Sequence, residues 1–379
     1  MTANDGGELH RGLNGVYFDR SRTCFIDGRQ GKLQYRGYSI DDLATLSTFE
    51  ETAYLLLYGE LPTRPQLAEL ESELISARAV PGSIMDVIRL VGGAHPMDVL
   101  RTAVSALSAV DPEAGDHSPE ATRRKGTRLT AQVPSIITAH HAIRNDRDLV
   151  EPSKDLGHAA NFLYTLTGET PTDEAASLMD KDLILHAEHG SNASAFTARV
   201  VTGTRADVHS AITAAIAALS GPLHGGAAEN VMKMARAIEE PARAADYVKE
   251  VRARGEPIMG FGHRVYRTED PRARHLREGV RRLSQEKGEP KWYGILDAVV
   301  EAMRPLGRRG INVNVDFYSG ATYYLHGIPL DLFVPIFAVG RIPGWIAQVM
   351  EQQEANILIR PRLQYVGPLD SAYVPIDER

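Results

Sequence analysis

The sequence predicts a mainly α-helical protein of two domains with one short β-hairpin near its N-terminus. Three observations carry this prediction. Helix-capping signals followed by apolar residues at helical spacing recur along most of the chain. Only residues 24–35 alternate apolar and polar positions around glycine-containing turns, which is typical of a hairpin. The length of 379 residues exceeds one small core, so two or three domains are expected.

Four helix starts are signalled between the hairpin and residue 143. Two have capping-box spacing, in which a Ser or Thr precedes a Glu or Gln by three residues. The other two place a proline at the first helical position, where its missing N–H is harmless. The four starts are Ser47 with Glu50, Thr63 with Gln66, His95-Pro96, and Ser118-Pro119, the last opening a helix to about Ile143.

The second half of the chain continues the helical pattern. Helices are expected to resume near Leu156 and again after Thr170-Pro171. The stretch Ala211–Leu219 is apolar on all sides, which predicts a fully buried helix. A last apolar helix is expected over Leu330–Gln352, and the tail from Arg360 carries no helical signal.

The amino-acid composition shifts toward arginine and glycine after residue 225. We therefore expect a large helical domain formed by residues 1–224 and 326–379, and a small domain formed by residues 225–325. Between residues 261 and 310, twelve Lys and Arg stand against seven Asp and Glu. A solvated helical face explains part of this excess, and a binding site for a polyanionic small molecule would explain its clustering.

Composition narrows the possible classes of protein. The net charge of −7 argues against general nucleic-acid binding. The single Cys24 cannot form an intramolecular disulfide and suits a reducing cytoplasm, and Met1–His10 lacks the apolar region of a secretory signal. The apolar stretch Leu332–Val339 is shorter than the roughly 20 residues of a membrane span. Motifs of P-loop enzymes, nicotinamide enzymes, zinc proteases and serine hydrolases are absent from the sequence.

The stretch from Gly260 to Arg272 concentrates groups that could bind an anion. Glycines on both sides of Phe261 allow the backbone to approach a ligand closely, next to His263. Arg267 and Arg272 offer guanidinium forks suited to carboxylate or phosphate. Alone, the stretch is equally compatible with a basic surface turn before a helix.

Two other glycine-bounded segments, 221–226 and 312–320, contain His224 and Asp316. His224 follows a Gly-Pro break, so we expect it at a helix N-terminus, where the dipole favours a neutral ring. A neutral imidazole can donate one hydrogen bond to a developing enolate. Asp316 is the only carboxylate between Glu301 and Asp331, and it could act as a base, although a lone Asp is commonly a helix cap.

His186 and His189 are three residues apart, which would place both on one face of a helix, with Asn192 three residues further on. The pair could bind a metal with Asp316 as third ligand, or form two hydrogen-bonded core histidines. Because Asn192 is not a preferred metal ligand, the pattern favours a polar organic ligand.

Three more arginines are candidates for anion binding. Arg341 interrupts the last apolar helix and needs an anionic partner, which is either a substrate or an internal acid. Arg308 and Arg309 could hold phosphates or could be solvated.

These residues lie in motifs that resemble those of the citrate synthase family. The resemblance covers nearly the whole chain, and the motifs follow one another in the family's order. It implies a mostly helical homodimer with a large domain, a small mobile domain and an active site in the cleft between them. The motifs are Gly12-Leu-Asn-Gly-Val-Tyr, Tyr35-Arg-Gly-Tyr, His95-Pro-Met, Ala160-Asn-Phe-Leu, His186-Ala-Glu-His-Gly, Gly221-Pro-Leu-His-Gly-Gly, Gly260-Phe-Gly-His-Arg-Val-Tyr, Asn314-Val-Asp-Phe-Tyr and Arg360-Pro-Arg.

The resemblance also implies a role for each candidate residue. Asp316 resembles the base that removes a proton from the methyl group of acetyl-CoA, His224 the residue that stabilises the enol or enolate, and His263 the residue that polarises the oxaloacetate carbonyl. No tightly bound cofactor or metal is implied, since acetyl-CoA is a cosubstrate. Oxaloacetate-binding positions are matched by His189, Asn192, Arg272, Arg341 and, across the dimer, Arg360; CoA phosphate positions are matched by Arg267, Arg308 and Arg309.

The chain departs from the family pattern at Ser191, Ala195 and Ala228, where Phe, Thr and Asn are usual. These changes bear on substrate fit and rate rather than on the reaction. The chain also lacks the N-terminal extension of the hexameric, NADH-inhibited members, which favours the dimeric type.

The resemblance therefore implies the reaction of the citrate synthase family, and the single Cys24 favours a place in the cytoplasm. The alternative is 2-methylcitrate synthase acting on propionyl-CoA, although the segment 316–320 resembles that of citrate-forming members more closely. A remote alternative of another class is a metal-dependent hydrolase built on His186, Glu188, His189 and Asp316.

Overall fold

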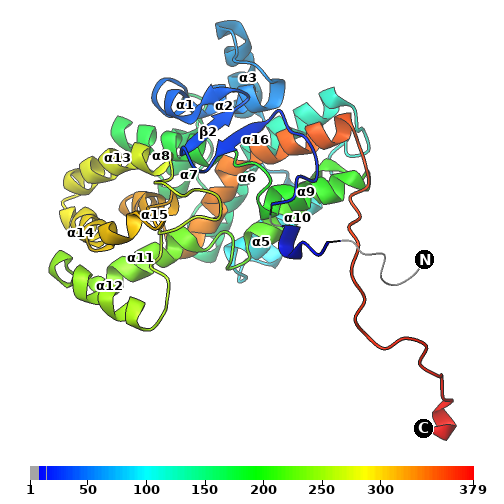
Figure 1. Ribbon diagram of the computed structural model, residues 1–379. Coiled ribbons are helices and arrows are strands. Elements are labelled where there is room, and N and C mark those ends of the chain that lie inside the picture. Colours follow the sequence, from blue (N-terminus) through cyan, green and yellow to red (C-terminus); the bar gives the residue numbers. More distant parts are fainter. Residues whose placement is uncertain (1–7, 14) are drawn as a thin grey trace.

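The structure is a computed structural model that describes residues 8–13 and 15–379. It is helical apart from one small antiparallel sheet of three strands in the order β1-β2-β3 (Figure 1). The predicted fold class is therefore confirmed. Most of Met1–His10, where no secretory signal was expected, and Asn14 of the first motif lie outside the described residues.

The predicted hairpin is present and gains a short third strand. Strand β1 (Cys24–Asp27) pairs with β2 (Lys32–Tyr35), with Cys24 opposite Tyr35, and β2 pairs with β3 (Tyr38–Ser39). The backbone oxygen of Gly28, in the turn between β1 and β2, accepts a hydrogen bond of 2.8 Å from the N–H of Arg267. The hairpin turn thus contacts the glycine-flanked segment 260–272.

Sixteen α-helices follow the hairpin within the described residues. The predicted starts at Pro96, Pro119 and near Leu156 are confirmed. Helices in the first half are α1 (Ile40–Leu46), α2 (Phe49–Tyr58), α3 (Arg64–Ser76), α4 (Gly82–Leu90), α5 (Pro96–Leu107), α6 (Pro119–Arg144), α7 (His158–Thr167) and α8 (Asp173–His186). Those in the second half are α9 (Ala193–Gly203), α10 (Val208–Leu219), α11 (Ala227–Ile238), α12 (Ala244–Ala253), α13 (Ala273–Glu286), α14 (Pro290–Gly307), α15 (Asp316–Leu325) and α16 (Phe333–Glu354).

One predicted capping box is shifted by a residue. At α2 the box joins Thr48 and Glu51, whose side chains and backbone N–H groups bond reciprocally at 3.2 and 3.0 Å. Ser47 is not available as N-cap because it ends α1, with its N–H bonded to the oxygen of Leu43. The box predicted for α3 is confirmed, since Gln66 accepts from the N–H of Thr63 at 2.8 Å.

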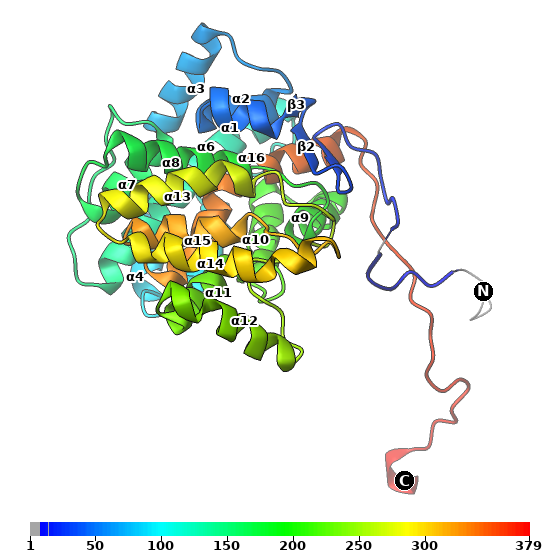
Figure 2. The same cartoon turned by 60° about the vertical axis from the view of Figure 1, so that its left-hand side comes forward.

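Helix α16 runs through the middle of the large helical body and packs against α6, α8, α9 and α10 (Figures 1 and 2). With the short turn before it, the helical segment Leu330–Glu354 is long and apolar enough to cross a membrane, which corrects the shorter estimate made for Leu332–Val339. Its apolar window is entirely buried inside the fold, as expected for the core helix of a folded domain.

The prediction of a fully buried helix over Ala211–Leu219, which is part of α10, is wrong for the single chain. Four of these residues are only partly buried: Thr213, Ala214, Ala217 and Ala218. The helix packs on α9, α5 and α16, which cover one face. An apolar sequence does not reveal whether the second face is covered by the same chain.

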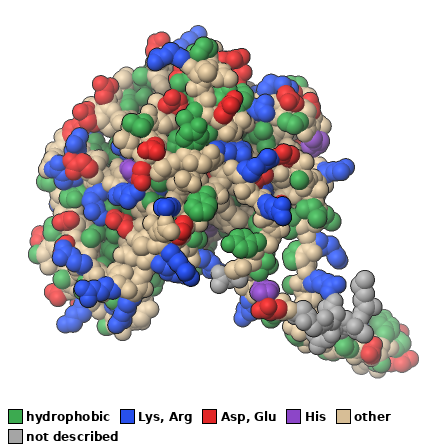
Figure 3. All heavy atoms as spheres, turned by 45° about the horizontal axis from the view of Figure 1, so that its top comes forward, with side chains coloured by type: hydrophobic (Ala, Val, Ile, Leu, Met, Phe, Trp, Pro, Cys, Tyr) green, Lys and Arg blue, Asp and Glu red, His purple; other side chains and the backbone are tan. Residues whose placement is uncertain are grey.

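Helices α11 to α15 gather on one side of the molecule, and the chain after α16 leaves the body as a tail (Figure 1). The tail begins on α9, where Asn356 donates to the oxygen of Gly203 at 3.3 Å. Every residue from 360 to 379 is exposed. The tail stands apart from the helical body in the space-filling view (Figure 3).

Candidate active site

Two of the glycine-bounded segments pair with each other through their backbones. The N–H of Gly262 donates to the oxygen of Asn312 at 2.8 Å, and Phe261 and Val313 form an isolated antiparallel bridge. Gly260 has φ 78° and an added Cβ would lie 2.5 Å from the ring of Phe317, so only glycine fits there. This pairing brings the loop of His263 to the start of α15, where Asp316 lies.

The ring of His263 is held in one tautomer by the backbone. Its Nδ1 accepts hydrogen bonds from the N–H groups of Val265 and Tyr266, at 3.0 and 3.2 Å. Burial and the nearby charge of Arg272 lower the pKa of His263 to about 4, so the ring is neutral near pH 7. Its one proton is therefore on Nε2, which makes Nε2 a hydrogen-bond donor.

His189 lies beside His263 but not on a helix with His186. Helix α8 ends at His186, and Gly190 turns the chain with φ 57°, so the predicted shared helix face is wrong. The imidazole centroids of His189 and His263 are 5.2 Å apart. Burial, followed by the charge of Arg272, lowers the pKa of His189 well below its usual value.

His224 lies two residues before Gly226, the N-cap of α11. Its Nε2 accepts from the backbone N–H of Ser194 at 3.3 Å and lies 2.8 Å from the hydroxyl oxygen of the same residue. That hydroxyl oxygen accepts from the indole N–H of Trp345 at 3.1 Å. Burial first, and Arg341 second, lower the pKa of His224 to about 4. The expected neutral ring is present, and its main cause is burial rather than the helix dipole.

Asn192 serves as the N-cap of α9. Its Oδ1 accepts from the N–H of Ala195 at 3.1 Å, and its Nδ2 donates to the oxygens of His189 and Gly190 at 3.4 and 3.3 Å. Both ends of the amide are thus used within the turn that carries His189. A substrate contact by Asn192 stays a prediction.

Arg272 is buried and bound by an acid that the sequence reading did not select. Asp270 accepts from Nε and Nη2 of Arg272 at 3.0 and 2.7 Å, and it also accepts from the N–H of Val315 at 3.3 Å. Burial acts to raise the pKa of Asp270, but the charge and hydrogen bonds of Arg272 outweigh it and lower the pKa. Asp270 fixes the guanidinium and leaves its Nη1 for another anion. Its only sequence signal was its place two residues before Arg272.

Arg341 is buried where α16 crosses the end of α8. A Cβ on Gly344 would lie 1.9 Å from the oxygen of Ala187, so glycine permits this close crossing. The Nε of Arg341 donates to the oxygen of His186, and no ion pair joins Arg341 to an acid among residues 8–13 and 15–379. The alternative of an internal acid as partner is represented only by Glu188, which interacts with Arg341 at longer range. Burial raises the pKa of Glu188 to about 7, although the charge of Arg341 acts to lower it.

Asp316 is the first residue of α15, and Val315 rather than Asp316 occupies the N-cap position. Burial raises the pKa of Asp316, while the charges of His186 and Arg272 act in the opposite direction. Desolvation makes a carboxylate a stronger base, which suits removal of a proton from a weak carbon acid.

The predicted CoA-binding arginines lie on the outside of the same region. Arg267 is exposed, and one of its Nη groups donates to the oxygen of His263 at 3.2 Å. Arg308 and Arg309 are also exposed, and Gly310 beside them approaches the backbone of Arg267, with 3.4 Å between an added Cβ and the Arg267 oxygen. The structure therefore brings these three arginines to one neighbourhood. Arg360, by contrast, is exposed in the tail.

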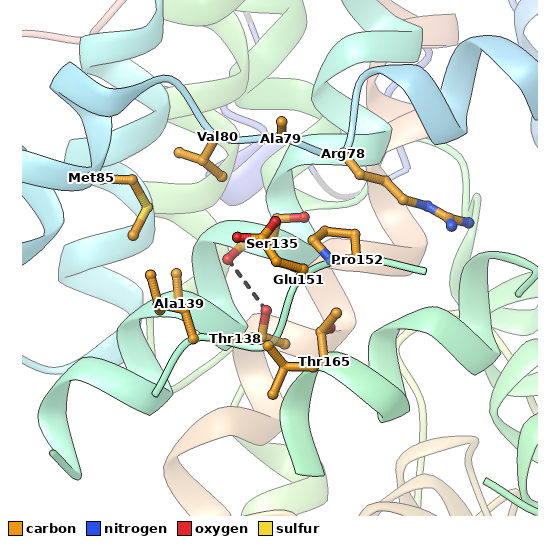
Figure 4. A pocket seen from close by; sticks show the side chains of 12 residues that line it. Arg78, Ala79, Val80, Met85, Ser135, Thr138, Ala139, Glu151, Pro152 and Thr165 are labelled. Carbon is orange, nitrogen blue, oxygen red and sulfur yellow. Dashed lines mark hydrogen bonds between the residues drawn. The ribbon is translucent and has the colours of Figure 1, made fainter. Parts of the chain in front are cut away.

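A separate cavity of about 150 Å³ lies between the α3–α4 link, α6, α7 and residues 149–152 (Figure 4). It shares no residue with the histidine site. The guanidinium of Arg78 points away from it and donates to the oxygen of Leu156 at 2.8 Å. Among all the residues that the structure describes, no three His, Cys, Asp or Glu side chains are arranged to hold a metal ion.

Comparison with known proteins identifies the family. Residues 12–362 match the family described as citrate synthase, C-terminal domain. The chain belongs to the citrate synthase family. It is 46% identical to citrate synthase of Haloferax volcanii, over 98% of this chain and 100% of the relative. It is 40% identical to 2-methylcitrate synthase 1 of Corynebacterium glutamicum, over 98% of this chain and 99% of that relative.

Solved structures of the citrate synthase family have the same fold. The citrate synthase of Pyrobaculum aerophilum matches with a TM-score of 0.93 and 40% identity, over 98% of this chain and 95% of that one. The enzyme of Thermoplasma acidophilum, solved with carboxymethyl coenzyme A and oxaloacetate, matches with a TM-score of 0.93 and 34% identity over 98% and 100% of the two chains. The predicted family, fold class and enzyme class are confirmed.

Proposed function

We propose that this chain condenses acetyl-CoA with oxaloacetate and hydrolyses the resulting thioester to citrate and CoA. The single observation that carries the proposal is the arrangement around Arg272, where neutral His263 presents an Nε2 donor beside a buried cation. A neutral donor next to a guanidinium suits a ketone flanked by a carboxylate. We also propose that the protein acts in the cytoplasm, as the single Cys24 led us to expect.

The proposed reaction uses three side chains in turn. The carboxylate of Asp316 takes a proton from the methyl carbon of acetyl-CoA, and His224 stabilises the enol or enolate through a hydrogen bond. The nucleophilic carbon then attacks the ketone carbon of oxaloacetate. The new alkoxide is stabilised by a hydrogen bond from Nε2 of His263, and the proton that it takes up balances the one removed by Asp316. Water finally cleaves the thioester, releasing CoA.

Binding of the substrates is proposed to use the charged groups around these residues. Oxaloacetate carries two carboxylates, and Arg272 and Arg341 are buried cations for which Asp270 is the only acid in contact among the described residues. His189 would contact the same substrate. The exposed Arg267, Arg308 and Arg309 suit the phosphates of CoA, because guanidinium groups bind phosphate bidentately. Relatives named citrate synthase and relatives named 2-methylcitrate synthase both match this chain, so its preference between acetyl-CoA and propionyl-CoA has to be tested.

The acyl preference is expected to favour acetyl-CoA. Release of free CoA in the presence of oxaloacetate should show a higher kcat/KM with acetyl-CoA than with propionyl-CoA. Omission of oxaloacetate is the control and should abolish release with both thioesters. A higher kcat/KM with propionyl-CoA would instead assign the chain to 2-methylcitrate formation.

We further propose that the chain works as a homodimer of two-domain subunits, with residues 225–325 moving against the rest. Closure is suggested by the placement of His263 and Arg272 within that segment, whereas His189 and Arg341 lie outside it. Dimerisation is suggested by the half-covered apolar helix α10 and by the exposed tail, which carries Arg360. A two-fold interface would bring the same arginine to both sites.

Mixing two inactive chains tests the proposed role of Arg360. Heterodimers of an Arg360→Ala chain and an Asp316→Asn chain should regain one intact site, because that site takes Asp316 from one chain and Arg360 from the other. Activity above both parent homodimers is the expected result. Purified heterodimers that are no more active than the parents would show that Arg360 acts within its own chain or not at all.

A further inference from the structure

Tyr266 is a buried polar residue at the candidate active site, and the proposed reaction assigns it no role. It lies three residues after His263, and its side chain is 0% exposed. The ring centroid of Tyr266 is 4.7 Å from that of His263 and 5.5 Å from that of His189. With 5.2 Å between the two imidazoles, the three rings form a closed triangle. A phenol so placed needs a hydrogen-bond partner.

The partner of the phenol is His189, whose Nε2 lies 3.1 Å from the Tyr266 oxygen. Both groups are neutral near pH 7, because burial raises the pKa of Tyr266 far above its usual range and lowers that of His189. A phenol is a better donor than a neutral imidazole, and an imidazole nitrogen is the better acceptor. The phenol therefore donates to Nε2, and the single ring proton of His189 must lie on Nδ1.

Nδ1 is the nitrogen of His189 that remains open. It has no hydrogen-bond partner among the described residues. It is also absent from the unpartnered side-chain atoms that are fully buried in that part of the chain, so it keeps access to open space. Oxaloacetate offers two carboxylates and a ketone oxygen, all of which are acceptors. Only a nitrogen that carries a proton can bind such groups. An open Nδ1 without a proton would repel them.

We propose that Tyr266 is a positioning residue that holds His189 in the tautomer protonated at Nδ1, so that this nitrogen donates to oxaloacetate. The inference rests on the proposed function, because it takes oxaloacetate as the ligand of His189. Tyr266 would then set both histidines, since its backbone N–H also donates to Nδ1 of His263 at 3.2 Å. Tyr266 thereby holds His189 protonated at Nδ1 and, together with Val265, holds His263 protonated at Nε2.

Removal of the phenol oxygen should weaken oxaloacetate binding selectively. Tyr266→Phe keeps the three-ring packing and is expected to raise KM for oxaloacetate about 10-fold, with kcat and KM for acetyl-CoA changed less than about 3-fold. Tyr35→Phe is the matched control, because its buried phenol donates, within the described part of the chain, to the backbone oxygens of Ile184 and Leu185, at 3.2 Å each, and not to a histidine. Equal effects of the two variants, or an unchanged KM for oxaloacetate in Tyr266→Phe, would overturn the proposal.

Amide substitutions at His189 test the tautomer without altering Tyr266. The amide nitrogen of Asn can replace Nδ1 of histidine, whereas that of Gln can replace Nε2. His189→Asn should therefore retain more oxaloacetate affinity than His189→Gln, as measured by calorimetric titration. Tighter binding by the Gln variant would contradict a donor at Nδ1.

Nitrogen-15 NMR of histidine-labelled, substrate-free protein observes the tautomer directly. The His189 signals are assigned by their loss in His189→Asn. The proton is expected on Nδ1 in the wild type and in a mixture of tautomers in Tyr266→Phe. A wild-type proton on Nε2 would overturn this inference and leave the proposed function intact, whereas a wild type that forms no citrate would remove the proposed function and leave the tautomer result standing.

Discussion

Replacement of Asp316 by Asn is expected to lower kcat by at least about 100-fold, as loss of a general base does. The amide has nearly the same shape but cannot take a proton from the methyl group of acetyl-CoA. Because burial already disfavours the charged form of Asp316, a neutral amide should fit without loss of stability. Steady-state kinetics, together with the melting temperature and the affinity for oxaloacetate, check the prediction.

Asp297→Asn is the matched control for this substitution. Asp297 is an exposed carboxylate on α14, outside the site, and its loss should leave kcat unchanged. An Asp316→Asn enzyme that retains more than a tenth of the wild-type kcat would remove Asp316 from the role of base.

The second large effect is expected at Asp270. Asp270→Asn leaves Arg272 as a buried cation without its counter-ion, and such a change typically costs about 3–5 kcal/mol of the free energy of unfolding. Because Asp270 also orients the guanidinium through two hydrogen bonds, KM for oxaloacetate should rise as well. Denaturant unfolding and steady-state kinetics measure the two effects.

Asp331→Asn provides the comparison for the loss of an ion pair. Asp331 pairs with Arg144 at 2.5 Å, but its side chain is 39% exposed, so its loss should cost less than about 1 kcal/mol. Similar losses of stability in the Asp270 and Asp331 variants would show that the buried pair of Asp270 and Arg272 contributes no more to stability than an exposed ion pair.

The sequence was most informative where one residue type is required locally. Glycines flanking Phe261 and the prolines at Pro96 and Pro119 predicted a close backbone approach and two helix starts, and the helix starts are confirmed. The neutral state of His224 was also expected. These features depend on residues within a few positions of one another, which the sequence displays directly.

The partners of the site residues could not be predicted because they are distant in the chain. Tyr266 bonds to His189 across 77 positions, and Ser194 contacts His224 across 30. The spacing of His186 and His189 suggested one helix face, but α8 ends at His186, so His189 lies beyond the helix. Only the folded chain shows which polar group lies opposite which.

The prediction that α10 is buried on all sides failed for a related reason. The amino-acid sequence of this helix indicates that all its faces are apolar, but it does not indicate which chain covers each face. The same holds for the tail, whose exposed residues carry Arg360. Both features become consistent with the rest of the fold if a second copy covers them.

The central claim, that this site joins two substrates through a new carbon–carbon bond, is tested most directly by isotope transfer. Wild-type enzyme is incubated with oxaloacetate and acetyl-CoA labelled with carbon-13 at both acetyl carbons, and the products are analysed by mass spectrometry. The expected product is citrate that carries both labelled carbons, formed in equal amount with free CoA and almost absent with Asp316→Asn. Release of CoA and labelled acetate without labelled citrate would show simple thioester hydrolysis and contradict the account.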